Sequence, residues 1–188
     1  MKTVDKYIFQ ALDNYPYWLE GTIESLDYAL SYNEKDTTAL CLYGRVQSEQ
    51  LQDYEEAKRY FQEALAINLH AVAVYPYYLD ALLWNEDYEE ASNLIDFALT
   101  IKGTDKIAIQ LKKVMLLEKQ QEVILALKLL KEIKLMVIAN DNLHEIEETE
   151  KRLKTKKKLL APKNKTKSEK EVLEKEKKKK GKRKWFFL

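Results

Sequence analysis

The 188-residue chain holds one cysteine, four glycines and three prolines, and each shortage argues against a class of protein. The single cysteine, Cys41, cannot form an internal disulfide and is typical of a reducing compartment. A β-sandwich or barrel needs turn residues about every 8–12 positions, and glycine and proline are too rare here to supply them. The longest apolar stretch, residues 123–130, is interrupted by Lys128 and falls short of the roughly 18 residues of a spanning helix. We therefore predict a helical, cytoplasmic protein without a transmembrane segment.

Residues that could carry out a reaction are also scarce. The two histidines, His70 and His144, are far apart in the sequence, and neither has a cysteine or a second histidine at metal-ligand spacing. Glycine-rich phosphate-binding motifs are absent, and the many carboxylates fall where solvated helix faces and helix starts place them. The sequence therefore predicts no enzyme activity, no cofactor and no metal site.

The net charge of +1 conceals a strong division of charge along the chain. Residues 1–150 contain 14 lysines and arginines against 27 acidic residues, which gives 14 − 27 = −13. Residues 151–188 contain 18 basic residues against four glutamates, which gives 18 − 4 = +14. The sequence thus predicts an acidic body followed by a basic tail.

Two segments of the body are nearly the same: QDYEEAKRYFQEAL at 52–65 and EDYEEASNLIDFAL at 86–99. In each, an aspartate (Asp53 or Asp87) precedes a glutamate (Glu56 or Glu90) by three positions. This pattern predicts a capping box, in which the aspartate accepts a backbone N–H of the first turn and the glutamate reaches back to the aspartate N–H.

Small and large apolar residues then follow at helical spacing, and the same pattern occurs four times. The four sets are Thr22, Leu26, Ala29 and Leu30; Ala57, Phe61, Ala64 and Leu65; Ala91, Ile95, Ala98 and Leu99; and Ala126, Leu130 and Ile133. Their first members are separated by 57 − 22 = 35, 91 − 57 = 34 and 126 − 91 = 35 residues. Further helices are predicted between them, at about 3–14, 37–51, 73–85 and 105–119. The sequence therefore predicts repeated units of two helices.

These units resemble the tetratricopeptide repeat (TPR), a family whose usual unit is two helices in about 34 residues. The best match is the second unit, where Leu40, Tyr43, Gly44 and Gln47 fall on the first helix of the family pattern, and Ala57, Phe61 and Ala64 fall on the second. The chain departs from the pattern in lacking the closing proline and in one extra residue between Gly44 and Ala57. The resemblance implies an all-α solenoid. Its predicted parts are four units at about 1–36, 37–71, 72–104 and 105–139, a capping helix within 140–161 whose apolar stripe is Leu143, Ile146 and Leu153, and a Lys-rich disordered tail at 162–188.

The resemblance also implies a function. Members of the family usually bind a partner's peptide segment in a groove lined by the first helix of each unit. Carried over to this chain, that groove would contain Tyr7, Arg45, Ser48, Asp80, Trp84 and Met115. The chain lacks the basic clamp with which some members hold a C-terminal carboxylate, and Asp80, Glu49 and the tyrosines would instead suit a basic or an apolar segment. The predicted function is therefore a non-enzymatic scaffold for a protein partner of unknown identity.

The tail leaves several hypotheses open. Its basic residues Lys178, Lys179, Lys180, Lys182, Arg183 and Lys184, followed by Trp185, would attract RNA, DNA or an anionic surface without sequence specificity. A nucleic-acid-associated or surface-associated protein anchored by this tail is the alternative function. The tail could instead lie against the acidic body or only add solubility. Homo-oligomerisation is also open, because an exposed end helix can pair with a second copy.

Overall fold

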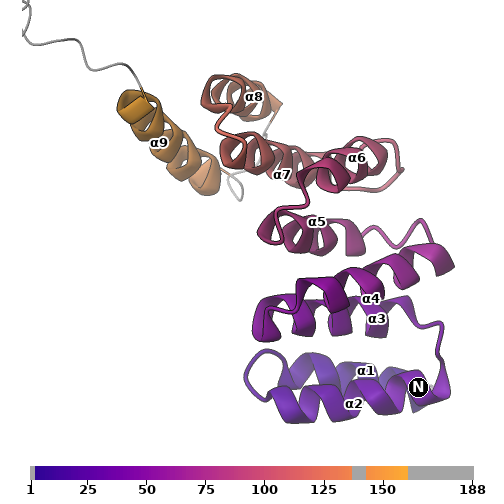
Figure 1. Ribbon diagram of the computed structural model, residues 1–188. Helices are drawn as coiled ribbons and strands as arrows, with labels where there is room; N and C mark the ends of the chain where they lie inside the picture. Colours follow the sequence, from indigo (N-terminus) through magenta and orange to yellow (C-terminus); the bar gives the residue numbers. More distant parts are fainter. Residues whose placement is uncertain (1–2, 137–142, 161–188) are drawn as a thin grey trace, which may run out of the picture. The chain divides into compact units, whose positions relative to one another are not determined.

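The structure is a computed structural model, and it describes residues 3–136 and 143–160. Within these residues every regular element is helical, and no strand occurs (Figure 1). The elements are α1 (Thr3–Asn14), α2 (Leu19–Tyr32), α3 (Thr37–Arg45), the π-helical segment η1 (Val46–Leu51), α4 (Tyr54–Ile67), α5 (Val74–Trp84), α6 (Tyr88–Ala98), α7 (Lys106–Lys119), α8 (Val123–Met136) and α9 (Leu143–Leu160). The predicted all-α class is confirmed for this part of the chain. The predicted basic tail at 162–188, with Lys178 to Trp185, lies outside the described residues.

From α1 to α8, each helix packs on the next helix along the chain. A second set of contacts joins alternate helices, because α1 contacts α3, α3 contacts α5 and α5 contacts α7. Residues from α3, α5 and α7 therefore meet on one side of consecutive helix pairs, and the candidate site lies among them.

The helix starts explain part of the repeated DYEEA motif. Asp53 accepts the backbone N–H of Glu56 at 3.1 Å, so the predicted N-cap at Asp53 is confirmed. The N-cap bond predicted for Asp87 is wrong, because its side chain caps no backbone N–H and instead accepts bonds from Lys58 Nζ and Asn85 Nδ2, both at 2.7 Å. Lys58 comes from α4, so a residue of the preceding helix pair draws the Asp87 carboxylate away from its own helix.

The glutamate half of each capping box is also wrong. The backbone N–H of Asp53 donates to the carbonyl of Gln47, and that of Asp87 donates to Leu82, so neither N–H is left for a glutamate. Glu56 pairs with Arg59 at 2.7 Å, and Glu90 accepts the Tyr78 hydroxyl. The backbone N–H groups of Asp53 and Asp87 thus satisfy carbonyls at the end of the preceding helix, while each aspartate stands directly before the next helix.

Left-handed backbone ends the first helix of three successive pairs. Gln52, Glu86 and Gln121 have φ angles of 57°, 64° and 65°. Their separations are 86 − 52 = 34 and 121 − 86 = 35 residues, which match the spacing of the apolar sets. A residue just after each one closes the turn: the N–H of Asp87 reaches back five positions to Leu82, and that of Glu122 reaches back five positions to Leu117. This spacing is that of a Schellman helix end.

At the corresponding turn after η1, the closing bond runs from Asp53 back to Gln47 and spans six positions. A π-helix contains one residue more per hydrogen-bonded turn than an α-helix. The single extra residue between Gly44 and Ala57 is therefore taken up by η1, and the turn that follows keeps the form seen after α5 and α7.

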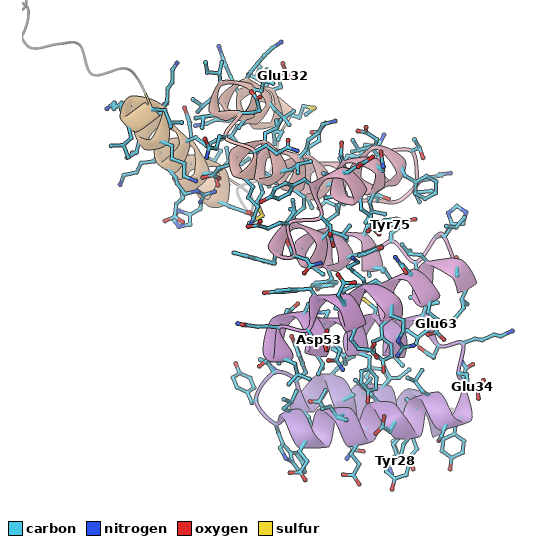
Figure 2. All side chains as sticks on the ribbon, in the orientation of Figure 1. Tyr28, Glu34, Asp53, Glu63, Tyr75 and Glu132 are labelled. Atoms are coloured by element: carbon cyan, nitrogen blue, oxygen red, sulfur yellow. The ribbon has the colours of Figure 1, made fainter. Side chains whose placement is uncertain are left out.

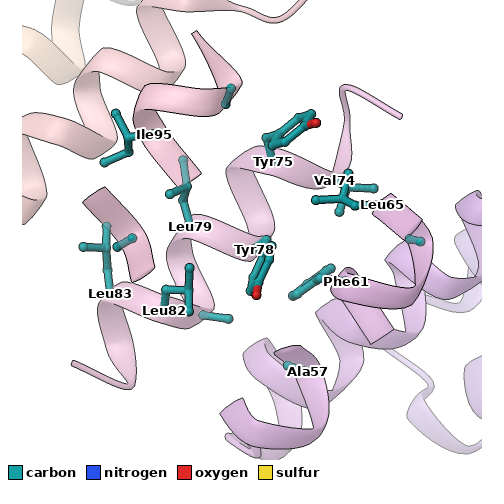
Figure 3. Close-up of a cluster of buried hydrophobic side chains, with 14 of the residues drawn as sticks. Ala57, Phe61, Leu65, Val74, Tyr75, Tyr78, Leu79, Leu82, Leu83 and Ile95 are labelled. Carbon is teal, nitrogen blue, oxygen red and sulfur yellow. The ribbon is translucent and has the colours of Figure 1, made fainter. Parts of the chain in front are cut away.

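The predicted apolar sets form the cores of the helix pairs. Ala57, Phe61 and Ala64 are fully buried, as are Ala91, Ile95 and Ala98, whereas Leu30 and Leu99 are only partly buried. Figure 3 shows Phe61 of α4 facing Tyr78 of α5, and their ring centroids are 5.6 Å apart. Gly44 of α3 packs directly against the Phe61 ring. The small residues thus allow the close helix contacts that the repeat pattern predicted.

The predicted stripe on residues 140–160 is found on α9. Ile146 and Leu153 are fully buried and share a cluster with Val114 and Leu130, while Leu143 is partly buried. Residues 140–142 and 161 of the predicted capping segment lie outside the described residues.

Candidate functional site

The six residues predicted to bind a partner do not all lie together. Ser48 of η1 and Asp80 and Trp84 of α5 line one cavity of about 380 Å³. Arg45, at the end of α3, lines a different cavity of about 320 Å³ between α3 and the start of α5. Met115 of α7 is partly buried and packs against the core cluster that includes the α5 residues Leu79, Leu82 and Leu83.

Tyr7 lies apart from these five residues. Its ring stacks on Tyr28 and Tyr32 of α2, at centroid distances of 5.2 and 5.9 Å. Tyr28 and Tyr32 are exposed, and Figure 2 shows Tyr28 pointing away from the α1–α2 pair. The position of Tyr7 was predicted from the family groove, whereas the structure places its ring among the tyrosines of its own helix pair.

Arg45 is held by three parts of the chain. Its guanidinium carbon lies 4.7 Å from the centroid of the Tyr15 ring and 4.2 Å from that of the Tyr77 ring, so the group lies close to two aromatic rings. Its Nε also lies 3.1 Å from Glu49 Oε1, and the Tyr15 hydroxyl donates to the same carboxylate. Burial and the bond to Glu49 raise the pKa of the Tyr15 hydroxyl to about 12, which keeps it protonated and able to donate. Arg45 thus connects the α1–α2 turn to α5.

Asp80 has an equally close partner on the next alternate helix. Lys112 Nζ of α7 lies 2.6 Å from Asp80 Oδ1 and 2.8 Å from Oδ2. Burial raises the pKa of the Asp80 carboxyl; the ammonium of Lys112 opposes this effect but does not cancel it. The ion pair is half-buried and joins α5 to α7.

Trp84 forms the third connection. Lys119 Nζ of α7 lies 4.5 Å from the centroid of the Trp84 ring, within the range of a cation–π contact. The indole is still 55% exposed, so one part of it is open to a ligand.

Two of these connections have the same offset along the chain. Arg45 meets Tyr77 across 77 − 45 = 32 residues, and Asp80 meets Lys112 across 112 − 80 = 32 residues. If Arg45, Asp80 and Met115 are aligned at a spacing of 35 residues, each contact joins one of these positions to the residue three positions before the next: Arg45 to Tyr77 and Asp80 to Lys112. Arg45 and Asp80 were predicted from the sequence, but Tyr15, Tyr77, Lys112 and Lys119 were missed. No local pattern marks these partners, because the 32-residue offset follows from the packing of the first helices.

The charges of this surface are almost balanced. Arg45, Lys112 and Lys119 supply three positive charges against the two of Glu49 and Asp80, which gives 3 − 2 = +1. Both carboxylates that favoured a basic ligand in the sequence are already paired. The charges of the site therefore favour the apolar alternative over the basic one.

The cavity lined by Arg45, which we call the Cys41 cavity, has a mainly apolar lining. It is formed by Leu12, Thr37, Thr38, Cys41, Leu42, Arg45, Ala71, Val72, Ala73, Val74 and Tyr77. Burial raises the pKa of the Cys41 thiol to about 11, which indicates weak solvation at the cavity wall. The second, which we call the Trp84 cavity, is lined by Ser48, Glu49, Gln52, Tyr54, Asp80, Ala81 and Trp84 and is more polar.

Neither comparison with known proteins finds a match: no model of a protein family matches the chain, and no curated protein matches it. Two other properties can be stated for residues 3–136 and 143–160. No group of three histidine, cysteine or acidic side chains converges there in a way that could hold a metal ion. No helix in the same residues has the length and apolar character needed to cross a bilayer.

Proposed function

We propose that residues 1–139 form four TPR-like units of an α-solenoid. Three spacings support this proposal. The apolar sets recur at 35, 34 and 35 residues, and the left-handed helix ends recur at 34 and 35 residues. Two contacts between first helices, Arg45 with Tyr77 and Asp80 with Lys112, share an offset of 32 residues and begin 80 − 45 = 35 residues apart. The contacts of α1 with α3, α3 with α5 and α5 with α7 are those expected when each unit covers its neighbour.

The function that we propose is a non-enzymatic scaffold that binds a segment of a partner protein along α3, η1 and α5. The observation that carries this proposal is the presence of two open cavities beside each other along these helices, with the exposed indole of Trp84 at one of them. Exposed aromatic side chains beside a pocket are typical of residues that contribute strongly to protein–protein binding. We expect the scaffold to act in the cytoplasm, because its single cysteine forms no internal disulfide.

A matched pair of tryptophans provides the test. Trp84 and Trp18 are 55% and 56% exposed, but Trp18 lies at the start of α2, outside both cavities. The full-length protein would be used to select binders from a library of random linear peptides. We expect selected peptides to lose at least about ten-fold in affinity on Trp84→Ala and less than about two-fold on Trp18→Ala, because a central aromatic contact is worth 1.4 kcal/mol or more.

Circular dichroism would verify that both variants keep the helical content of the wild type. A failure to select any peptide, or an equal loss of affinity on both variants, would contradict a binding surface at Trp84.

The charge of residues 151–188 favours a second candidate, binding to RNA, DNA or an anionic membrane surface. Its test is a full-length variant in which Lys178, Lys179 and Lys180 are changed to glutamate. Binding of single-stranded RNA and of anionic vesicles would be measured at low and physiological salt. We expect a salt-dependent affinity that the variant loses, and binding that is equal for both proteins would contradict this candidate.

A further inference from the structure

The two cavities lie in line along one seam, between α3–η1 on one side and α5 on the other. Cys41 and Val74 line the Cys41 cavity, and Ser48 and Ala81 line the Trp84 cavity. On each side of the seam the residue at the Trp84 cavity follows the residue at the Cys41 cavity by seven positions, since 48 − 41 = 7 and 81 − 74 = 7. Seven residues of helix rise by about 10 Å, so one short peptide can reach both cavities.

The Cys41 cavity offers little to a charged group. Among the lining residues that the structure describes, Arg45 alone is charged, and its guanidinium is already engaged by Glu49, Tyr15 and Tyr77. An ammonium entering this cavity would lie close to Arg45, and a carboxylate would have to displace Glu49. Either charge would also lose its hydration in a mainly apolar space.

The size of this cavity suits a side chain of the partner. Its volume of about 320 Å³ is at the lower end of the range of roughly 300–1,000 Å³ found for small ligand sites. Leu12, which is 41% exposed, adds an apolar surface to its lining. The cavity can therefore hold one large apolar side chain.

We propose that the Cys41 cavity binds an uncharged apolar side chain (leucine, methionine or phenylalanine) of the partner segment, and that a second side chain three residues away contacts the Trp84 cavity. In a polyproline II conformation, side chains three residues apart lie on one face, about 9 Å from each other, which matches the separation of the two cavities. This inference rests on the proposed function and adds the chemistry and spacing of the bound segment.

Cys41 is the single cysteine of the chain, so the Cys41 cavity can be tested by covalent capture without a known partner. Full-length protein would be incubated to equilibrium with mixed disulfides that carry isobutyl, benzyl, carboxylate or ammonium groups on linkers of equal length. Capture at Cys41 would be measured by intact mass. We expect the apolar groups to be captured at least about ten-fold more than either charged group, and all four to be captured alike in urea, where the cavity is absent.

The raised pKa of the thiol slows the exchange with every reagent, but the captured amounts are compared at equilibrium and do not depend on the rate. The variant Ala73→Trp places a large ring in the lining at an exposed position and should reduce the apolar capture, whereas Trp18→Ala should leave it unchanged. Equal capture of charged and apolar groups by the folded protein would overturn the inference.

The peptides selected on the full-length protein provide the second arm. Those that depend on Trp84 should carry an apolar residue three positions from a second anchor. If they instead carry a charged residue there, this inference is overturned and the proposed scaffold function still holds. If no peptide depends on Trp84, the proposed function fails. Selective capture at Cys41 would then show an apolar cavity that does not bind a partner segment, and this result would also overturn the inference.

Discussion

Gly44 and Gly21 allow the packing argument to be tested with one substitution at two sites. A Cβ added at Gly44 would lie 2.6 Å from the Phe61 ring, and one added at Gly21 would lie 2.6 Å from the Trp18 ring. Both glycines are helical, so alanine would gain up to about 1 kcal/mol of helix propensity at either site. The two rings differ in their freedom to move, because Phe61 is fully buried and stacked on Tyr78, whereas Trp18 is 56% exposed.

The expected free energies of unfolding follow from that difference. Phe61 cannot move without disturbing the core, so Gly44→Ala should cost about 1–3 kcal/mol in overpacking, which cancels or exceeds the propensity gain. Trp18 can turn toward solvent, so Gly21→Ala should keep the same propensity gain without that cost and be up to about 1 kcal/mol more stable than the wild type. The two variants should therefore differ by at least about 1 kcal/mol, or roughly 2–4 °C in Tm for a chain of this size.

Urea denaturation followed by far-UV circular dichroism would measure both variants against the wild type. An unchanged slope with a lower midpoint for Gly44→Ala would show a loss of stability of the native state. If Gly44→Ala is as stable as Gly21→Ala, the burial of the neighbouring ring does not decide the cost, and the packing argument for the α3–α4 contact fails.

Three further predictions concern single side chains. Bonds from Lys58 and, less strongly, from Asn85 lower the pKa of the Asp87 carboxyl from 3.8. The carboxylate therefore stabilises the fold above about pH 4, and this contribution is lost as the pH falls through the pKa of the folded state. Asp87→Asn should flatten the acid side of the stability–pH profile, and an unchanged profile would argue against the bonds to Lys58 and Asn85. Burial raises the pKa of the Cys41 thiol from 9.0 to about 11, which lowers the fraction of reactive thiolate at pH 8. Iodoacetamide should therefore alkylate the native thiol about 100-fold more slowly than the thiol in urea. Similar rates in the two states would show that Cys41 is not buried. Arg45→Lys keeps the charge but loses the planar contact with the aromatic rings, so it should lower the free energy of unfolding by about 0.5–1 kcal/mol, and no loss in urea denaturation would show that the rings contribute nothing.

Much of the fold could be predicted because it depends on local patterns. The helices expected at 3–14 and 105–119 are found at Thr3–Asn14 and Lys106–Lys119. Helical periodicity and burial are properties of neighbouring residues, so alternating small and large apolar positions were enough to locate the buried face of α4. The bond at Asp53 is equally local.

The prediction for Asp87 failed for the opposite reason. Asp53 and Asp87 share the DYEEA motif, but Asp87 accepts bonds from Lys58, 29 residues before it, and from Asn85, where the corresponding residue before Asp53 is Leu51. The extra residue before Ala57 was visible in the sequence, but its accommodation in a π-helical segment depends on how α3 packs on α4. Partners that lie 32 residues away, as Tyr77 does from Arg45, cannot be assigned before the packing of the first helices is known.

The offset of 32 residues also has a consequence for protein engineering. If the 35 residues 70–104 were duplicated, Tyr77 of the second copy would lie 77 + 35 − 80 = 32 positions after Asp80 of the first copy and would take the place of Lys112 beside it. The carboxylate would lose its cation and meet a phenol, although every apolar position of the core would be preserved. The helix pairs of this protein are therefore alike in shape but fixed in order, and a rearranged version would need new residues at positions 45, 80 and their partners.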